Sequence, residues 1–294
     1  MTLRLSNLHG ALLGLVACGL FAVSDMTIKF LGAGYNPFQI IFFAGLMTFP
    51  LIVGVIAADP SPGNLRPRLP KLMAWRSVIV LFNGILGTFA FANLPLAQCY
   101  AIFFTMPILI TLLSVPVLGE KIDLLRGVAV VAGLIGVVIA LDPGAGALDW
   151  GHAAALGGAV LGAANFVMIR KTGAVERTIV MLLYPLLLQM VVAAIALPWV
   201  YQPMPIGDLG LTAAMATVSF IGYFLIVAAY RKAPSIIVAP MQYSQIIWAA
   251  IFGAWLFGEH LSGRVWFGTA VIILAGIAIV SRRDPSAQIS AATS

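Results

Sequence analysis

Charge is what this chain of 294 residues has least of: 9% of its residues are charged, whereas 62% are hydrophobic. A soluble domain carries roughly 25% charged residues. A chain with so little charge cannot cover a soluble surface, and the composition therefore predicts a membrane protein. The 29 glycines agree with this interpretation, because small residues let helices approach one another closely in lipid.

The residue types that build disulfide frameworks and metal centres are also scarce. The two cysteines, Cys18 and Cys99, fall within or beside expected helices, and buried free thiols are favoured over a disulfide. The three histidines, His9, His152 and His260, fall at segment ends and are too scattered to indicate a metal site. We therefore expect neither a metal nor a cofactor.

Sequence signatures of enzymes are absent as well. The chain contains no Gly-x-Gly-Asp or His-Glu-x-x-His sequence of an intramembrane protease and no phosphate-binding loop for ATP. A serine lipid hydrolase would need a base inside the membrane. The sequence predicts a protein that is not an enzyme. A channel is the other competing class, but a channel needs an oligomeric pore ring or a continuous polar pathway.

Ten apolar segments are long enough to cross a bilayer, for which about 20 residues are needed. We expect a retained first helix rather than a signal peptide, because the first stretch is too long for one. The fold class is thus an all-α polytopic membrane protein of ten transmembrane helices, followed by a disordered tail, 284–294. The expected spans are 9–32, 38–58, 72–94, 97–118, 124–141, 150–170, 178–198, 208–231, 236–257 and 264–281.

The basic residues alternate with these spans. If the N-terminus is cytoplasmic, 14 lysines and arginines fall on the cytoplasmic side and two, Lys29 and Arg264, fall outside. This positive-inside bias predicts that both termini are cytoplasmic. The net charge of +6 is better explained in this way than by nucleic acid or a polybasic partner site. The cytoplasmic set is Arg4, Arg66, Arg68, Lys71, Arg76, Lys121, Arg126, Arg170, Lys171, Arg177, Arg231, Lys232, Arg282 and Arg283.

One spacing occurs twice. Pro95 precedes Glu120 by 25 residues, Pro234 precedes Glu259 by the same distance, and a Gly-Glu pair ends each block. The offset of 139 residues predicts a duplication into halves 1–141 and 142–283. Five crossings per half insert the second half upside down. Such inverted repeats place a transporter's substrate site near mid-membrane, between the halves.

Ten helices in two halves, with a Leu-Gly-Glu or Phe-Gly-Glu run closing the fourth helix of each, resemble the drug/metabolite transporter superfamily, most closely its EamA-type exporters. The resemblance spans the whole chain. It departs in the first helix, where relatives often carry Trp-Gly and this chain has Gly19-Leu20-Phe21-Ala22. It implies a bacterial inner-membrane exporter of small metabolites, often amino acids, with a central cavity. Efflux of drugs, nucleosides or sugars is the alternative.

Candidate substrate-binding residues gather in the ninth segment. Gln242, Tyr243, Ser244 and Gln245 are consecutive, with Trp248 one turn further. Intramembrane polarity usually faces a cavity or a partner, and together the cluster favours the cavity, although any one residue could instead bond a neighbouring helix. Pro240 removes a backbone donor and can bend the helix, which suggests coupling or gating.

The fourth segment is the repeat equivalent, and its candidates are Tyr100 and Phe104, with Pro107 as a gating candidate. With the 139-residue offset, Phe104 matches Tyr243. An aromatic wall would then face a polar wall, which suits a zwitterion with an apolar side chain; aromatic packing is the alternative. The further candidates Asn83, Asn165 and Tyr223 lie in the third, sixth and eighth segments. Helix-helix bonding competes for Asn165, which follows a Gly158-xxx-Gly162 motif.

Asp25 is the acid well inside a segment, and Lys29 follows one turn later. This order lets the two pair, so the pair could couple protons, gate, or merely neutralise itself. We expect Glu120 and Glu259 to bond helix ends and brace the halves. The expected partners are a small-molecule substrate and the bilayer, without nucleic acid, in a monomer or a weak homodimer.

Overall fold

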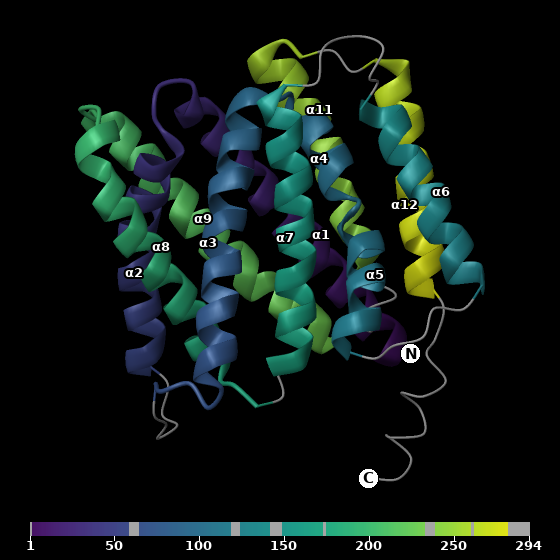
Figure 1. Ribbon diagram of the computed structural model, residues 1–294, viewed down its shortest axis with the longest axis horizontal. Helices are drawn as coiled ribbons and strands as arrows, with labels where there is room; N and C mark the ends of the chain where they lie inside the picture. The colour runs from purple at the N-terminus through teal and green to yellow at the C-terminus, as the bar shows by residue number, and fades with distance from the viewer. Residues whose placement is uncertain are drawn as a thin grey trace.

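The computed structural model describes residues 2–58, 65–118, 124–141, 149–172, 175–232, 239–259 and 262–281, and these residues are helical apart from short turns (Figure 1). Seven of the spans are long and apolar enough to cross a membrane by themselves. The helices are α1 (Thr2–Gly32), α2 (Pro37–Ala58), α3 (Pro70–Asn93), α4 (Leu96–Phe103), α5 (Met106–Leu118), α6 (Leu124–Leu141), α7 (Trp150–Thr172), α8 (Thr178–Val200), α9 (Ile206–Lys232), the 3-10 helix η1 (Ala239–Tyr243), α11 (Ser244–Phe257) and α12 (Gly263–Ser281).

Local sequence explains where several helices begin. Asn36 accepts a hydrogen bond from the Phe38 amide, and Pro37 occupies the first position of α2, where a missing N–H costs nothing. Asp149 caps α7 in the same way by accepting from the His152 amide at 3.1 Å. Both caps lie between the expected spans. The helix ends agree with those spans to within a few residues, except that α1 begins seven residues earlier.

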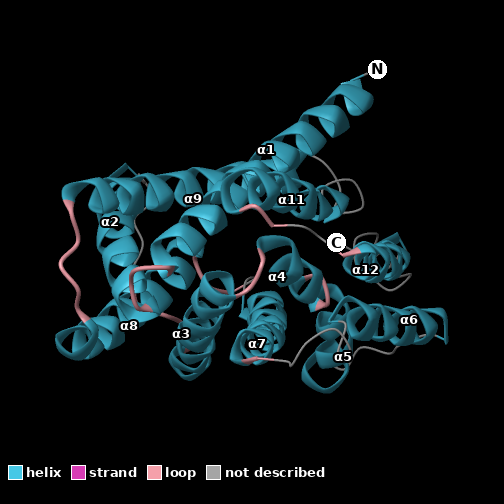
Figure 2. Ribbon diagram, turned by 90° about the horizontal axis from the view of Figure 1, so that it is seen from above, coloured by secondary structure: helices cyan, strands magenta, loops and turns pink. Residues whose placement is uncertain are grey.

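The two halves interlock instead of standing side by side. Counting spans, α1 corresponds to α7 and α3 corresponds to α9 in the other half. The contact of α1 with α9 is therefore the repeat image of the contact of α7 with α3. The self-equivalent pairs α2 with α8, α4 with α11 and α6 with α12 also touch. In Figure 2, α6 and α12 form a pair at one side of the bundle.

The halves run in opposite directions. We call the end of the bundle where α1 finishes the upper end, as in Figure 1, and the other the lower end. Since α1, α2 and α3 alternate, α3 also finishes at the upper end. A side chain at Gly151, at the start of α7, would meet Leu94 just past α3, so α7 begins at the upper end whereas α1 ends there. The inverted arrangement predicted from the odd number of crossings is therefore present.

The fourth and ninth spans are each divided into two elements, a detail that the expected spans did not contain beyond the bend suggested at Pro240. In the fourth span, α4 ends at Phe103 and α5 begins at Met106. In the ninth span, η1 ends at Tyr243 and α11 starts at Ser244. The two discontinuities are related by the 139-residue offset. Pro107 and Pro240 are the neighbouring prolines: Pro107 is second in α5, where its missing N–H is tolerated, and Pro240 is second in η1.

Candidate functional site

The two helix breaks meet each other inside the bundle. The rings of Phe104 and Tyr243, which are repeat equivalents, pack edge to face with centroids 5.1 Å apart. Phe104 is buried and Tyr243 is half-buried. The ring of Tyr100 continues the contact, 6.0 Å from that of Phe104. Broken helices carry backbone groups outside regular helix bonding, and transporters place such breaks at their substrate and ion sites.

Asp25 of α1 lies beside this aromatic cluster. Its carboxylate accepts a hydrogen bond from the hydroxyl of Tyr100, in α4. The next residue back, Ser24, accepts from the hydroxyl of Ser219, in α9, at 2.6 Å. Asp25 therefore bonds a tyrosine of the fourth span, and the expected pair with Lys29 is wrong. Tyr100, expected to line the cavity, is buried with its hydroxyl already engaged.

Lys29 instead forms an ion pair across the two halves. Its Nζ lies 2.8 Å from Oε1 of Glu259, and it also donates to the carbonyl of Leu94. The second carboxylate oxygen of Glu259 accepts the backbone N–H of Leu96, at the start of α4, at 2.9 Å. The two side chains are 13% and 15% exposed. We call these four residues the upper latch, because they join α1, α4 and the end of α11 at the upper end.

The Gly-Glu pair of the sequence repeat builds the latch. Gly258 adopts φ of 64°, a left-handed conformation that suits glycine, and it ends α11. The Glu259 amide then bonds the Gly253 carbonyl at 2.9 Å. A Cβ on Gly253 would lie 2.7 Å from Glu259 Oε2, so both glycines are needed to fold the carboxylate back. The equivalent Glu120 lies outside the described residues.

The polar cluster of the ninth span divides at the break. Gln242 and Tyr243 belong to η1, Gln245 belongs to α11, and all three are half-buried. Trp248 packs on α1, 3.5 Å from the position of a Cβ on Gly19, and its ring stacks with Phe252 at 6.1 Å. One face of the Trp248 ring therefore serves helix packing.

Two of the three scattered candidates, Asn83 and Asn165, lie on adjoining helices. Asn83 Oδ1 is 3.5 Å from the Cβ position of Gly162, which places Asn83 at the contact of α3 with α7. Asn165 follows one turn later on α7, and its Oδ1 is buried without a hydrogen-bond partner. Tyr223, on α9, is half-buried. An unpaired buried amide oxygen is costly and calls for a ligand or water.

Sequence reasoning overlooked Arg76, which it counted among the cytoplasmic surface charges. Arg76 is 6% exposed, one Nη donates to the Met181 carbonyl at 2.6 Å, and its buried Nε has no partner. A local signal for this site existed at Pro185, whose missing N–H leaves the Met181 carbonyl without its helical donor.

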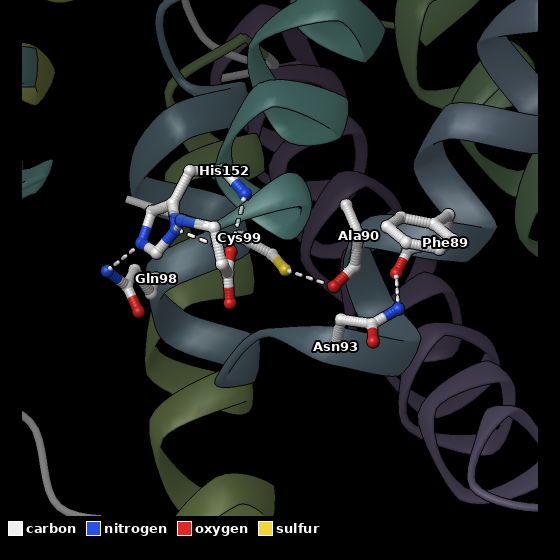
Figure 3. A network of polar contacts seen from close by, with 7 residues as sticks. Phe89, Ala90, Asn93, Gln98, Cys99 and His152 are labelled. Atoms are coloured by element: carbon white, nitrogen blue, oxygen red, sulfur yellow. Dashed lines mark hydrogen bonds and ion pairs between the residues drawn. The ribbon is translucent and has the colours of Figure 1, made fainter. Parts of the chain in front are cut away.

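A second polar contact joins the halves at the upper end (Figure 3). Gln98 of α4 points toward His152 of α7, with Nε2 to Nε2 at 2.9 Å, and the other ring nitrogen of His152 lies 2.7 Å from Asp149. Burial pushes the pKa of Asp149 upward, but its hydrogen bonds to His152 outweigh this and lower the pKa below the usual range. Cys99 donates to the Ala90 carbonyl at 3.3 Å in the same view.

A groove of about 210 Å³ lies elsewhere, between α3, α5 and α7 toward the lower end. It is lined by apolar side chains such as Leu113 and Val167, and by Trp75, which is 63% exposed. The groove adjoins an exposed tryptophan and lies apart from the helix breaks, so it is not part of the candidate site.

Comparisons with known proteins agree with this architecture. The model of the EamA-like transporter family matches the chain twice, over residues 8–141 and 149–282. The S-adenosylmethionine uptake transporter of Rickettsia bellii is 24% identical over 88% of this chain and 89% of its own. The riboflavin transporter of Vibrio cholerae is 26% identical over 94% of both chains, and the pseudopaline exporter of Pseudomonas aeruginosa is 25% identical over 93% and 96%.

A crystal structure with 18% identity superposes with a TM-score of 0.63, covering 92% of this chain and 98% of that one. This similarity extends the agreement in fold to an experimental structure. The repeated match, the ten crossings and the paired helix breaks lead to one conclusion. The chain belongs to the EamA-like transporter family, and it is a multi-pass membrane protein that carries small metabolites by secondary transport.

Proposed function

We propose that this carrier exports small amphipathic zwitterions, amino acids and aromatic ones among them, by alternating access between its two halves. The observation that carries the proposal is the meeting of the two helix breaks at Phe104 and Tyr243. The rings of Tyr100 and Phe104 pack there toward Tyr243 of η1, and Gln242 and Gln245 flank Tyr243 in the sequence. This combination suits a substrate with an apolar side chain and a polar head.

The neutral amides are the proposed contacts for the polar head. Gln242 and Gln245 adjoin the break in the ninth span, and an amide can bond ammonium and carboxylate groups alike. Asn83 and Asn165 extend this set along α3 and α7. The unpaired Oδ1 of Asn165 supports the assignment, since a substrate group would supply the missing partner. Tyr223 completes the proposed set on α9.

Coupling is assigned to Asp25 and gating to the upper latch. Asp25 is an acid inside the first span whose partner is a tyrosine instead of a cation, an arrangement that can take up and release a proton. The latch ties the halves together at the upper end, so opening that end requires breaking the pair of Lys29 with Glu259. The basic-residue bias supports a lower, cytoplasmic end with both chain termini, in a bacterial inner membrane.

The names of the relatives support amino-acid-like cargo only in part. S-adenosylmethionine contains the amino and carboxyl groups of methionine, and its transporter is similar along most of this chain. Riboflavin has neither group in that form, and a transporter named for it is just as similar. Transport of other planar metabolites is therefore the second candidate, which the aromatic cluster around Phe104 favours.

Counterflow in liposomes tests the proposal. Purified protein is reconstituted into liposomes that are preloaded with unlabelled threonine, methionine or phenylalanine. The liposomes are then exposed to the same compound in labelled form, and riboflavin and a sugar are tested in parallel. We expect saturable counterflow of the amino acids, and Gln242→Ala or Gln245→Ala should raise the half-saturation concentration about fivefold, the value of one hydrogen bond. Movement of riboflavin or the sugar alone would refute the amino-acid assignment.

A further inference from the structure

Arg76 is a buried cation. It lies about 9 Å along α3 from Pro70, counted at 1.5 Å per residue, and is 6% exposed. Among the described residues, Arg76 bonds the Met181 carbonyl, and no carboxylate lies within ion-pair distance. Burying one charge without a partner costs several kcal/mol. Such a charge inside a membrane protein usually marks a functional site.

Satisfying the Met181 carbonyl does not account for this charge. The carbonyl needs one donor, because Pro185 removes the N–H that would have bonded it within α8. A neutral donor would serve it without the cost of a buried cation. The guanidinium has five N–H groups in a planar fork, and the Nε remains unpaired in a buried position. This unpaired Nε is available to an anion.

The position of Arg76 relates it to another buried polar atom without a hydrogen-bond partner, Oδ1 of Asn165. Asn83 meets Gly162 where α3 and α7 pack in opposite directions. Asn165, three residues after Gly162, therefore lies at a level between Asn83 and Arg76, about 4.5 Å below Asn83. Its buried Oδ1 also has no partner. A buried acceptor near the level of a buried cationic donor matches the ammonium and carboxylate of one zwitterion.

We infer that Arg76 binds the carboxylate of the transported molecule and that this carrier selects organic anions or zwitterions with a carboxyl group. The inference rests on the proposed function. It adds that the substrate must carry a carboxylate, whereas the neutral amides alone can bind either an ammonium or a carboxylate group. Guanidinium matches carboxylate geometry with two parallel hydrogen bonds. Arg76 thus acts as a specificity-determining residue on the lower side of the helix breaks.

Ligand-dependent stability tests the inference without any transport assay. Thermal unfolding of the purified protein is followed with propionate or with propionamide, which differ in the carboxylate. We expect propionate, and not propionamide, to raise the Tm of the wild type and of the control Lys171→Gln, which removes an exposed cation at the same end. Arg76→Gln should lose the response, and Arg76→Lys should keep part of it. Equal responses to the two compounds in the wild type, or an unchanged response in Arg76→Gln, would overturn the inference.

The proline provides a way to separate folding from binding. Pro185→Ala restores the N–H that bonds the Met181 carbonyl, so adding it to Arg76→Gln should recover any lost thermal stability. If Arg76 served this carbonyl alone, the double variant would regain wild-type behaviour in every assay. We expect it to regain Tm while remaining unresponsive to propionate. A regained propionate response would assign Arg76 a purely structural role.

Counterflow then ties the site to transport. Methionine and methioninamide compete for labelled methionine, and the wild type should prefer the acid by roughly tenfold or more, as expected for a charge-assisted hydrogen bond. Arg76→Gln should abolish this preference, whereas Lys171→Gln should keep it. If the wild type moves no amino acid, the proposed function fails, but the response to propionate still decides the role of Arg76.

Discussion

Breaking the upper latch should open the upper end of the transporter. Glu259 accepts from Lys29 Nζ at 2.8 Å and from the Leu96 amide at 2.9 Å, both in the other half of the chain. Glu259→Gln keeps an acceptor but removes the charge. Hydrogen bonds to charged groups contribute about 1.5–3 kcal/mol, and we take about 2 kcal/mol for this partly exposed pair. If these bonds are absent when the upper end is open, the open population should rise roughly 30-fold.

A native cysteine reports this opening. Cys99 is fully buried three residues after Leu96 and bonds the Ala90 carbonyl. In a Cys18→Ala background, we expect a membrane-impermeant maleimide to modify Cys99 at least tenfold faster in Glu259→Gln than in the parent, because roughly one decade corresponds to 1.4 kcal/mol. The control is Asn93→Ala, which removes an exposed polar side chain at the same end that bonds the Phe89 carbonyl within its own helix. The measurement is the alkylation rate by mass spectrometry.

Coupling between the two residues provides the second arm. Lys29→Met should accelerate alkylation to a similar extent, and the double variant Lys29→Met with Glu259→Gln should add little to either single change. Additive effects would mean that the residues act separately. An unchanged rate in Glu259→Gln, or an equal acceleration by Asn93→Ala, would refute the latch.

Three further predictions concern the interior, the packing and the topology. Asp25→Asn should abolish gradient-driven accumulation in proteoliposomes while sparing counterflow; accumulation at the wild-type level would exclude coupling through Asp25. Gly32→Ala should lower the Tm, because its Cβ would lie 2.4 Å from the Cβ of Ala92 and such overpacking costs about 1–3 kcal/mol; Gly54→Ala, with open space around it, is the control and should leave the Tm unchanged. A reporter fused after Ser294 should read cytoplasmic, and a tag between 142 and 149 should be reachable from outside; a cytoplasmic tag would contradict the proposed orientation.

The ten crossings and their duplication could be predicted because both depend on local and periodic features. Length and hydropathy determine the spans, and turn residues such as Asn36 and Pro37 determine their ends. The repeat of Pro95 and Glu120 at Pro234 and Glu259 gave an offset that also relates Phe104 to Tyr243. The rings of these two residues lie 5.1 Å apart. A sequence repeat can thus indicate which residues meet, since symmetry brings equivalent residues to a common axis.

The helix breaks themselves could not be predicted from propensity. The residues at the first break, Phe104 and Thr105, are apolar or weakly polar and continue the hydrophobic run. Pro107 was a visible signal, but a proline near a helix start is compatible with an unbroken helix that begins there or with a kinked one. What decides between them is the packing of α4 against α11, which is a contact between the halves.

The wrong pairing of Asp25 with Lys29 has an energetic explanation. An i,i+4 pair contributes about 0.2–0.5 kcal/mol to a helix. Lys29 gains more from Glu259 and the Leu94 carbonyl together, since charge-assisted bonds in a partly buried site contribute about 1.5–3 kcal/mol. Asp25 then takes the Tyr100 hydroxyl. The sequence indicates the weaker local pair of Asp25 with Lys29, whereas the folded chain forms the stronger pair of Lys29 with Glu259 across the halves.

The role of Arg76 could not be predicted either, because it too depends on a contact between residues far apart in the sequence. A basic residue six positions into the third span looked like part of the cytoplasmic charge bias, and its position near a helix end suited that interpretation. The proline at 185 indicates from sequence alone that one carbonyl of α8 lacks its donor. That Arg76 fills the gap depends on a contact between residues 105 positions apart, which neither periodicity nor charge alternation encodes. Sequence rules can therefore identify a backbone carbonyl that lacks its helical donor. Only the packed bundle shows which side chain bonds this carbonyl and that its Nε remains unpaired.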